Sequence, residues 1–173
     1  MKLAHSLLAG AALAVLAAGS ASAADLLTSI DPIYSSPLFN FEGLYVGVQG
    51  GGAVESGTPY GLLGVVVGSN FAITNGIVAG LEFQGDVYYN GGFTAYDALA
   101  LGRLGGFLAE NTMIYGQLGV GVTNTSPVYA LGIGAEMALA GQLSVRGELQ
   151  GLGSFGAGPS AAKATVGLLW HLN

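Results

Sequence analysis

Apolar side chains alternate with polar side chains or glycine in several short stretches of the chain, and turn residues separate these stretches. The clearest stretch runs from Ile77 to Val87. Its large apolar residues share one parity, whereas Glu82, Gln84 and Asp86 share the other. Because successive side chains of a β-strand point to opposite faces, this stretch is predicted to be a strand with one apolar and one charged face.

The same pattern predicts eight strands between residue 41 and the last residue. We expect them at residues 41–53, 60–73, 77–89, 95–109, 113–123, 128–140, 142–153 and 162–172. Their connections are of two kinds. Tight turns are expected at 74–76, 110–112 and 140–142, and longer connections rich in Gly, Ser or Pro at 55–59, 90–92, 124–127 and 154–161. This alternation is typical of an up-and-down barrel with short periplasmic turns and longer extracellular loops.

The composition indicates a surface that faces lipid. Charged residues make up only 8% of the chain and the mean hydropathy is +0.60, whereas soluble domains carry about 25% charged residues. The longest apolar stretches after the leader, 62–73 and 130–141, are short and are broken by Gly, Ser, Asn or Glu. Helical spans are therefore disfavoured, and a closed barrel is the other fold that satisfies its backbone within a bilayer. The expected fold is all-β, an eight-stranded antiparallel transmembrane β-barrel over residues 41–173.

Residues 1–23 have the pattern of a secretory signal peptide. Lys2 precedes an apolar run over residues 7–18, and Ala21-Ser22-Ala23 fits a small-x-small cleavage site. We therefore expect export and cleavage after Ala23. The alternative is an uncleaved anchor helix, but the run is shorter than the roughly 20 residues that a bilayer span requires.

The next segment, residues 24–40, contains Asp, Ser and two prolines and has no clear period. This composition predicts a flexible periplasmic segment. An ordered N-terminal plug is the alternative, which a short and polar segment can form only in part.

The expected mature chain has few charges and no cysteine. Its three strong bases, Arg103, Arg146 and Lys163, face ten Asp and Glu, which gives a net charge of −7. Nucleic-acid binding needs clustered Lys and Arg, and the sequence has no such cluster. The lack of Cys excludes disulfides and thiol chemistry, and no group of His and acids has the spacing of a metal site. We expect no metal and no cofactor.

Strand parity also predicts which charged side chains point into the barrel. A charge that faces lipid at the bilayer midplane costs about 2–4 kcal/mol for Arg or Lys, and a buried ion without a partner is also expensive. We therefore predict an interlocked charge network that fills the lumen and blocks free passage. Its members are Glu82, Asp86, Arg103, Glu136, Arg146, Glu148 and Lys163. The alternative for Lys163 and His171 is a position at the water-exposed rim, and the faces of the strands at 60–73 and 95–109 stay open.

Aromatic residues gather towards the predicted strand ends. They are Tyr45, Tyr60, Phe71, Tyr89, Tyr115, Tyr129, Phe155 and Trp170. Such residues form girdles at membrane interfaces, but ordinary β-propensity explains the same distribution.

Three motifs carry a resemblance to a known family. Phe41-Glu42-Gly43-Leu44-Tyr45-Val46-Gly47-Val48 comes soon after a signal that ends in Ala-Ala-Asp-Leu, and Arg103-Leu104-Gly105 lies in the fourth predicted strand. The final strand reads polar-x-Gly-x-x-aromatic-x-hydrophobic, with Thr165, Gly167, Trp170 and Leu172 at the key positions. The chain thus resembles small outer-membrane β-barrel proteins of Gram-negative bacteria, the porin-family or OmpA-transmembrane-like group. It departs from the group in having Phe41 in place of the usual Trp and Asn173 in place of a terminal aromatic residue.

The resemblance implies an integral outer-membrane protein with a structural role in envelope integrity. The expected partners are outer-membrane lipid and lipopolysaccharide, the outer-membrane assembly machinery, whose C-terminal signal the last strand resembles, and periplasmic chaperones. The alternative is a narrow channel for water, ions or very small solutes, since eight strands are too few for a general porin. Catalysis needs a His near a nucleophile or acid, and the one mature histidine, His171, lies at the predicted periplasmic end, so we do not expect an enzyme.

Overall fold

A computed structural model describes residues 39–74 and 76–172 of the chain. The predicted signal peptide and residues 24–38 of the predicted flexible segment lie outside these described residues. Within them, no helix is long and apolar enough to cross a membrane.

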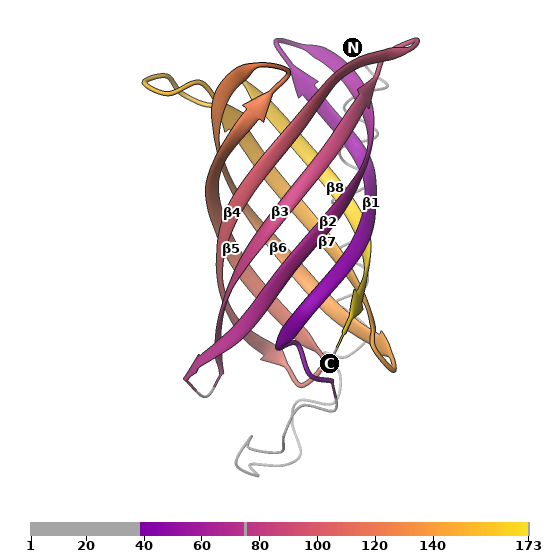
Figure 1. Ribbon diagram of the computed structural model, residues 1–173, viewed down its shortest axis with the longest axis vertical. Helices are drawn as coiled ribbons and strands as arrows, with labels where there is room; N and C mark the ends of the chain where they lie inside the picture. The colour runs from indigo at the N-terminus through magenta and orange to yellow at the C-terminus, as the bar shows by residue number, and fades with distance from the viewer. Residues whose placement is uncertain (1–38, 75, 173) are drawn as a thin grey trace, which may run out of the picture.

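Eight antiparallel strands form one closed barrel in which the strands follow chain order (Figure 1). They are β1 (Gly43–Glu55), β2 (Thr58–Thr74), β3 (Ile77–Tyr89), β4 (Phe93–Ala109), β5 (Thr112–Thr123), β6 (Ser126–Ala140), β7 (Leu143–Gly153) and β8 (Ala161–His171). Each strand pairs with its sequence neighbours, and β1 pairs with β8 to close the barrel. The predicted fold class is confirmed, and no predicted strand end differs by more than two residues from the observed one.

Apolar side chains cover the outer surface of the barrel. Leu118 is 70% exposed, and Leu81, Phe83 and Ile133 are exposed to a similar degree. Among the described charged residues only three are exposed, and they lie at strand ends or in turns: Glu42, Glu55 and Glu110. This outward apolar belt is the surface that a bilayer requires.

The predicted difference in loop length is mostly wrong. Ser56 and Gly57 alone join β1 to β2, and both have the positive φ, 48° and 84°, that a two-residue hairpin turn requires. The β5–β6 connection is equally short, and the β3–β4 connection, residues 90–92, is one residue longer. Only residues 154–160 form a loop of more than three residues. The error arose because Pro59 and Pro127 belong to the ladder, near the starts of β2 and β6, where a strand tolerates proline.

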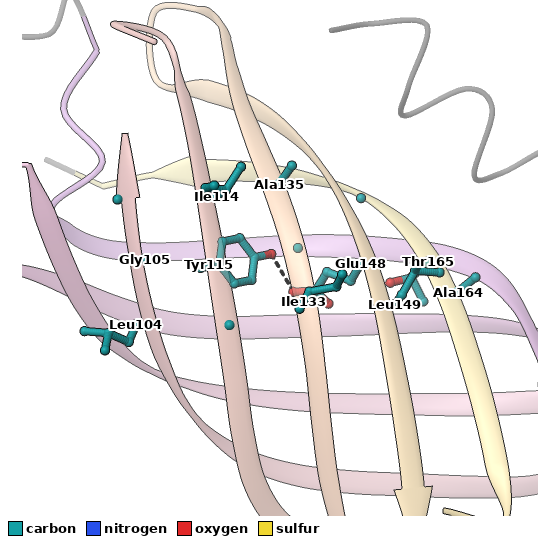
Figure 2. A pocket seen from close by; sticks show the side chains of 14 residues that line it. Leu104, Gly105, Ile114, Tyr115, Ile133, Ala135, Glu148, Leu149, Ala164 and Thr165 are labelled. Atoms are coloured by element: carbon teal, nitrogen blue, oxygen red, sulfur yellow. Dashed lines mark hydrogen bonds between the residues drawn. The ribbon is translucent and has the colours of Figure 1, made fainter. Parts of the chain in front are cut away.

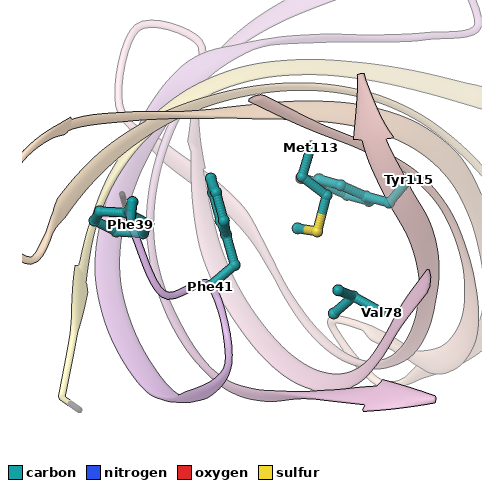
Figure 3. Close-up of a cluster of buried hydrophobic side chains, with 5 residues drawn as sticks. All are labelled: Phe39, Phe41, Val78, Met113 and Tyr115. Carbon is teal, nitrogen blue, oxygen red and sulfur yellow. The ribbon is translucent and has the colours of Figure 1, made fainter. Parts of the chain in front are cut away.

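The interior of the barrel has apolar clusters near both ends. We call the end at which residues 39 and 172 lie the terminal end, and the opposite end, with residues 154–160, the loop end (Figure 1). The terminal-end cluster consists of Phe39, Phe41, Val78, Met113 and Tyr115 (Figure 3). Two loop-end clusters consist of Leu99, Leu101, Val128, Ala130 and Leu152, and of Ala53, Leu62 and Tyr88.

These clusters explain why β2 and β4 did not show an alternating pattern. Leu62 and Val66 on β2 and Leu99 and Leu101 on β4 are buried inside the barrel. Both faces of these two strands are therefore apolar over part of their length, and the sequence pattern cannot distinguish them.

The aromatic residues divide between the two faces. Phe71, Tyr89, Phe155 and Trp170 are exposed on the outside, as an interfacial girdle requires. The prediction is wrong for Tyr45 and Tyr115, because both side chains are buried inside the barrel. Each uses its hydroxyl in a hydrogen bond to a lumen carboxylate, Tyr45 to Glu82 and Tyr115 to Glu148.

Candidate functional site inside the barrel

Glu82 on β3 is the hub of the buried polar side chains. Its Oε2 atom lies 2.5 Å from Arg146 Nη1 and 3.1 Å from Arg103 Nη1. The same oxygen accepts a 2.5 Å hydrogen bond from the Tyr45 hydroxyl, and Oε1 accepts one of 2.7 Å from Gln84. Two buried guanidinium groups therefore share this one carboxylate oxygen.

Each of these two arginines also reaches a second acid. Arg103 Nη2 lies 3.2 Å from Glu136, and Arg146 Nη2 lies 3.4 Å from Glu148. The Arg103 guanidinium also stacks over the Tyr115 ring, 3.8 Å from its centroid, a cation–π contact. The three acids and two bases thus form one connected group across the middle of the lumen.

Lys163 on β8 forms a second group nearer the loop end. Its Nζ lies 2.7 Å from Asp86 and 3.4 Å from Asp97. These two acids are direct cross-strand partners on β3 and β4. Like charges at opposing positions destabilise a sheet, so Lys163 is needed to compensate both.

The structure places all seven charged residues predicted for the lumen inside the barrel. Each is at most 4% exposed and takes part in at least one ion pair. The alternative position for Lys163 and His171, at a water-exposed rim, is wrong, because both side chains are fully buried.

Sequence reasoning missed several polar members of the site. They are Tyr45, Gln49, Tyr88, Asp97, Tyr115 and Ser144. Asp97 was missed because β4 lacks alternation, although one signal was available. A hairpin turn at residues 90–92 brings Asp97 opposite Asp86, so the register of the hairpin places both on one face.

A serine, a histidine and an acid meet near the terminal end, but they do not form a catalytic triad. Ser144 Oγ donates a 2.7 Å hydrogen bond to Glu136 Oε1, and His171 Nε2 lies 2.8 Å from the same oxygen. In a triad the acid holds Nδ1 and the serine meets Nε2. Here both partners meet Nε2, Nδ1 has no hydrogen-bond partner among the described residues, and all three side chains are fully buried.

The residues of the predicted assembly signal follow strand parity. Thr165 and Gly167 face the lumen, whereas Trp170 and Leu172 are 51% and 54% exposed on the outside. Their role in assembly stays a prediction. No group of three or more His, Cys or acidic side chains that could hold a metal ion occurs within residues 39–74 and 76–172.

Comparison with known proteins identifies the fold. Neither a family model nor a curated protein sequence matches the chain. A designed transmembrane β-barrel aligns with a TM-score of 0.52 and 14% identity over 77% of this chain and 98% of the design. Ail, the attachment invasion locus protein of Yersinia pestis, whose structure contains the heparin analogue sucrose octasulfate, aligns with a TM-score of 0.48 and 13% identity over 74% of this chain and 94% of Ail.

The alignment with the designed barrel agrees with the outward apolar belt and the closed ladder. The chain is a small transmembrane β-barrel.

The lipid-facing wall of this transmembrane β-barrel has a shallow groove of about 740 Å³ (Figure 2). Leu104, Ile114, Ile133 and Leu149 line it. Outward positions at Gly106, Gly116 and Gly147 lack side chains and make the wall thin there. On the inner side of the same wall, the Tyr115 hydroxyl donates a 2.6 Å hydrogen bond to Glu148.

We predict that Tyr88→Phe lowers the free energy of unfolding of this barrel by about 1.5 kcal/mol. The buried Tyr88 hydroxyl donates a 2.5 Å hydrogen bond to Asp97, and the variant leaves that carboxylate oxygen without this donor. Urea unfolding in detergent measures the change. Tyr89→Phe is the matched control, because Tyr89 is 41% exposed on the outer face and its loss of a hydroxyl is expected to change the free energy by less than about 0.5 kcal/mol.

Proposed function

We propose that the chain is a non-enzymatic integral protein of the bacterial outer membrane that supports the structure of the cell envelope. In this proposal the signal peptide directs export and is cleaved after Ala23, and a charge network fills the lumen. The observation that carries the proposal is the layered interior, in which ion pairs occupy the middle and apolar clusters lie near both ends. The interior of an eight-stranded barrel is just wide enough for side chains to fill.

The ion pairs support a structural role because they link opposite walls. Arg146 on β7 contacts Glu82 on β3, and Lys163 on β8 contacts Asp97 on β4. In each pair the two strands are four positions apart around the barrel, which is half of its circumference. These contacts therefore brace the cylinder across its diameter, and backbone pairing between neighbouring strands cannot do this.

We propose outer-membrane lipid, including lipopolysaccharide, as the main partner. Every Lys and Arg that the structure describes is buried, so side-chain cations of this part do not reach lipid phosphates. The contact is therefore assigned to the apolar belt and the acyl chains. The assembly machinery and periplasmic chaperones are further proposed partners, on the strength of the strand that contains Thr165, Gly167, Trp170 and Leu172.

Planar-bilayer recording tests this function. The wild-type barrel is expected to show no sustained conductance. Arg146→Leu is expected to lower thermal stability in detergent or to raise ion conductance, because it removes the ion-pair partner of Glu148 and one of the two guanidinium partners of Glu82. Glu55→Leu, at an exposed strand end, is the control that removes a charge outside the lumen. Steady conductance of the wild-type protein would favour a channel, and wild-type stability and conductance of Arg146→Leu would contradict the bracing role.

A narrow channel is the second candidate, and one observation favours it. Both amide atoms of Gln117 and the Oε1 atom of Gln150 are buried and have no hydrogen-bond partner among the described residues. Buried polar groups of this kind normally bind water. Osmotic swelling of liposomes that contain the barrel distinguishes the candidates, because a water pathway accelerates the volume change even when ions do not pass.

A further inference from the structure

The chain immediately before β1 crosses the mouth of the barrel at the terminal end. The Phe39 ring lies 4.9 Å from the His171 ring on β8, with an interplanar angle of 84°. The Phe41 ring lies 5.6 Å from the Phe107 ring on β4. The two rings lie side by side with their centroids 4.7 Å apart (Figure 3). Because β4 and β8 are opposite strands of the eight, the two rings link opposite walls of the barrel.

Both rings are buried although they lie outside the sheet. Phe39 is 6% exposed and Phe41 is 1% exposed. Phe41 packs with Val78 and Met113 from two further strands, and its carbonyl accepts a 3.0 Å hydrogen bond from Asn70 Nδ2. The segment thus contacts much of the wall around the mouth.

Gly43 provides the turn that directs this segment into the mouth. It is the first residue of β1, it pairs with Asn70, and its φ is 94°. Glycine adopts this left-handed region without the steric cost that a side chain brings. Residues 39–42, which we call the lid, therefore join the rigid ladder at a residue suited to act as a hinge.

A buried polar site lies beneath the lid. Ser144, Glu136 and His171 are fully buried, and the Phe39 ring packs nearly perpendicular to the His171 ring. The Nδ1 atom of His171 has no hydrogen-bond partner among the described residues. Water that enters when the lid opens offers this nitrogen a partner, which offsets part of the cost of exposing the two aromatic rings.

We propose that residues 39–42 form a hinged lid that pivots at Gly43 and closes the lumen from the solvent at the terminal end, separately from the ion pairs in its middle. The lid keeps the Ser144 site dry while it is closed. Its opening admits water to the Ser144 site.

The lack of cysteine in the whole chain permits a clean test. Ser144→Cys introduces a single thiol beneath the lid, and a water-soluble methanethiosulfonate reagent measures its exposure in the full-length, detergent-folded protein. With the native lid we expect slow labelling. Adding Phe39→Ala and Phe41→Ala is expected to raise the labelling rate at least about tenfold, because the aromatic contacts that hold the lid are lost.

Two controls separate lid opening from general loosening. Ser154→Cys places the thiol in the exposed loop at the opposite end. Its labelling rate is expected to be the same with the native lid and with the Phe39→Ala and Phe41→Ala lid. A heat-modifiable gel shift confirms that each variant is folded before labelling.

Gly43→Val is the second route to an open lid, because it leaves both rings intact and disfavours the positive φ of the hinge. It is expected to accelerate labelling of the Ser144→Cys thiol like the double alanine variant does, and it replaces that variant if the latter does not fold. The proposal is overturned if folded Gly43→Val protein labels as slowly as protein with the native lid. It is also overturned if the Ser144→Cys thiol under the native lid already reacts as fast as the Ser154→Cys thiol.

Discussion

Glu82→Gln is expected to lower the free energy of unfolding by about 3 kcal/mol, the lower end of the cost of breaking a buried ion pair, because Arg103 and Arg146 each keep a second acid. The change removes one negative charge from a position that two guanidinium groups share, those of Arg103 and Arg146. Glutamine has nearly the same shape as glutamate, so the loss measures charge compensation and not a cavity. Urea unfolding of the barrel in lipid vesicles, followed by tryptophan fluorescence from Trp170, gives the free energy.

A double-mutant cycle shows whether the loss belongs to the ion pair. Arg146→Met added to Glu82→Gln removes one of the two cations that lost Glu82 as a partner, so the double variant is expected to lose less free energy than the sum of the two single losses. Glu55→Gln is the surface control, with an expected change below about 0.5 kcal/mol. A strictly additive cycle would show that Glu82 and Arg146 do not stabilise each other in the folded barrel.

Leu118→Arg is expected to lower the free energy of unfolding in vesicles by about 2–4 kcal/mol, because it places a cation against the acyl chains. Leu118 is 70% exposed and lies near the middle of β5. In a water-soluble protein the same change at so exposed a site would alter stability by less than about 0.5 kcal/mol. The vesicle measurement therefore tests the membrane location of the outer surface directly.

Leu139→Arg is the matched control for the effect of depth. Leu139 is 49% exposed and lies one residue before the end of β6, next to a turn at the terminal end. Near the interface the cost of an arginine falls to about 0–1 kcal/mol. Equal losses for the two variants would contradict a bilayer centred on the middle of β5.

The sequence predicts a strand of this barrel best where one face of the strand is charged and the other is apolar. β3, β7 and β8 show this contrast, so both their positions and their inner faces follow from parity, as Glu82 and Arg146 illustrate. β2 and β4 carry Leu62, Val66 and Leu101 inward, and no pattern of polarity separates their faces. Their existence was predictable, but their orientation depends on the register with neighbouring strands.

The sequence predicts which residues belong to the site better than it predicts which of them contact one another. Which acid meets Arg146 depends on how the strands are staggered around the closed barrel, and periodicity within one strand carries no such information. Tyrosine adds a second ambiguity, since its ring suits an interface and its hydroxyl suits a buried carboxylate. The inward Tyr45 and the outward Tyr89 therefore cannot be distinguished in the sequence. The lid rings of Phe39 and Phe41 were also not predictable, because the sequence around them has no strand or helix periodicity.

The cross-barrel bracing has a consequence for how the chain folds. Arg146 meets Glu82 across 64 residues of sequence and Gln49 across 97. These distant partners come together only when β1 pairs with β8. In a partly formed sheet the buried cations therefore lack their native ion-pair partners. Adding strands one at a time therefore gains little free energy until β1 and β8 pair. Contacts of such long range also make folding slow. In kinetic experiments the barrel is therefore expected to fold in a slow, all-or-none transition whose rate is set by the pairing of β1 with β8.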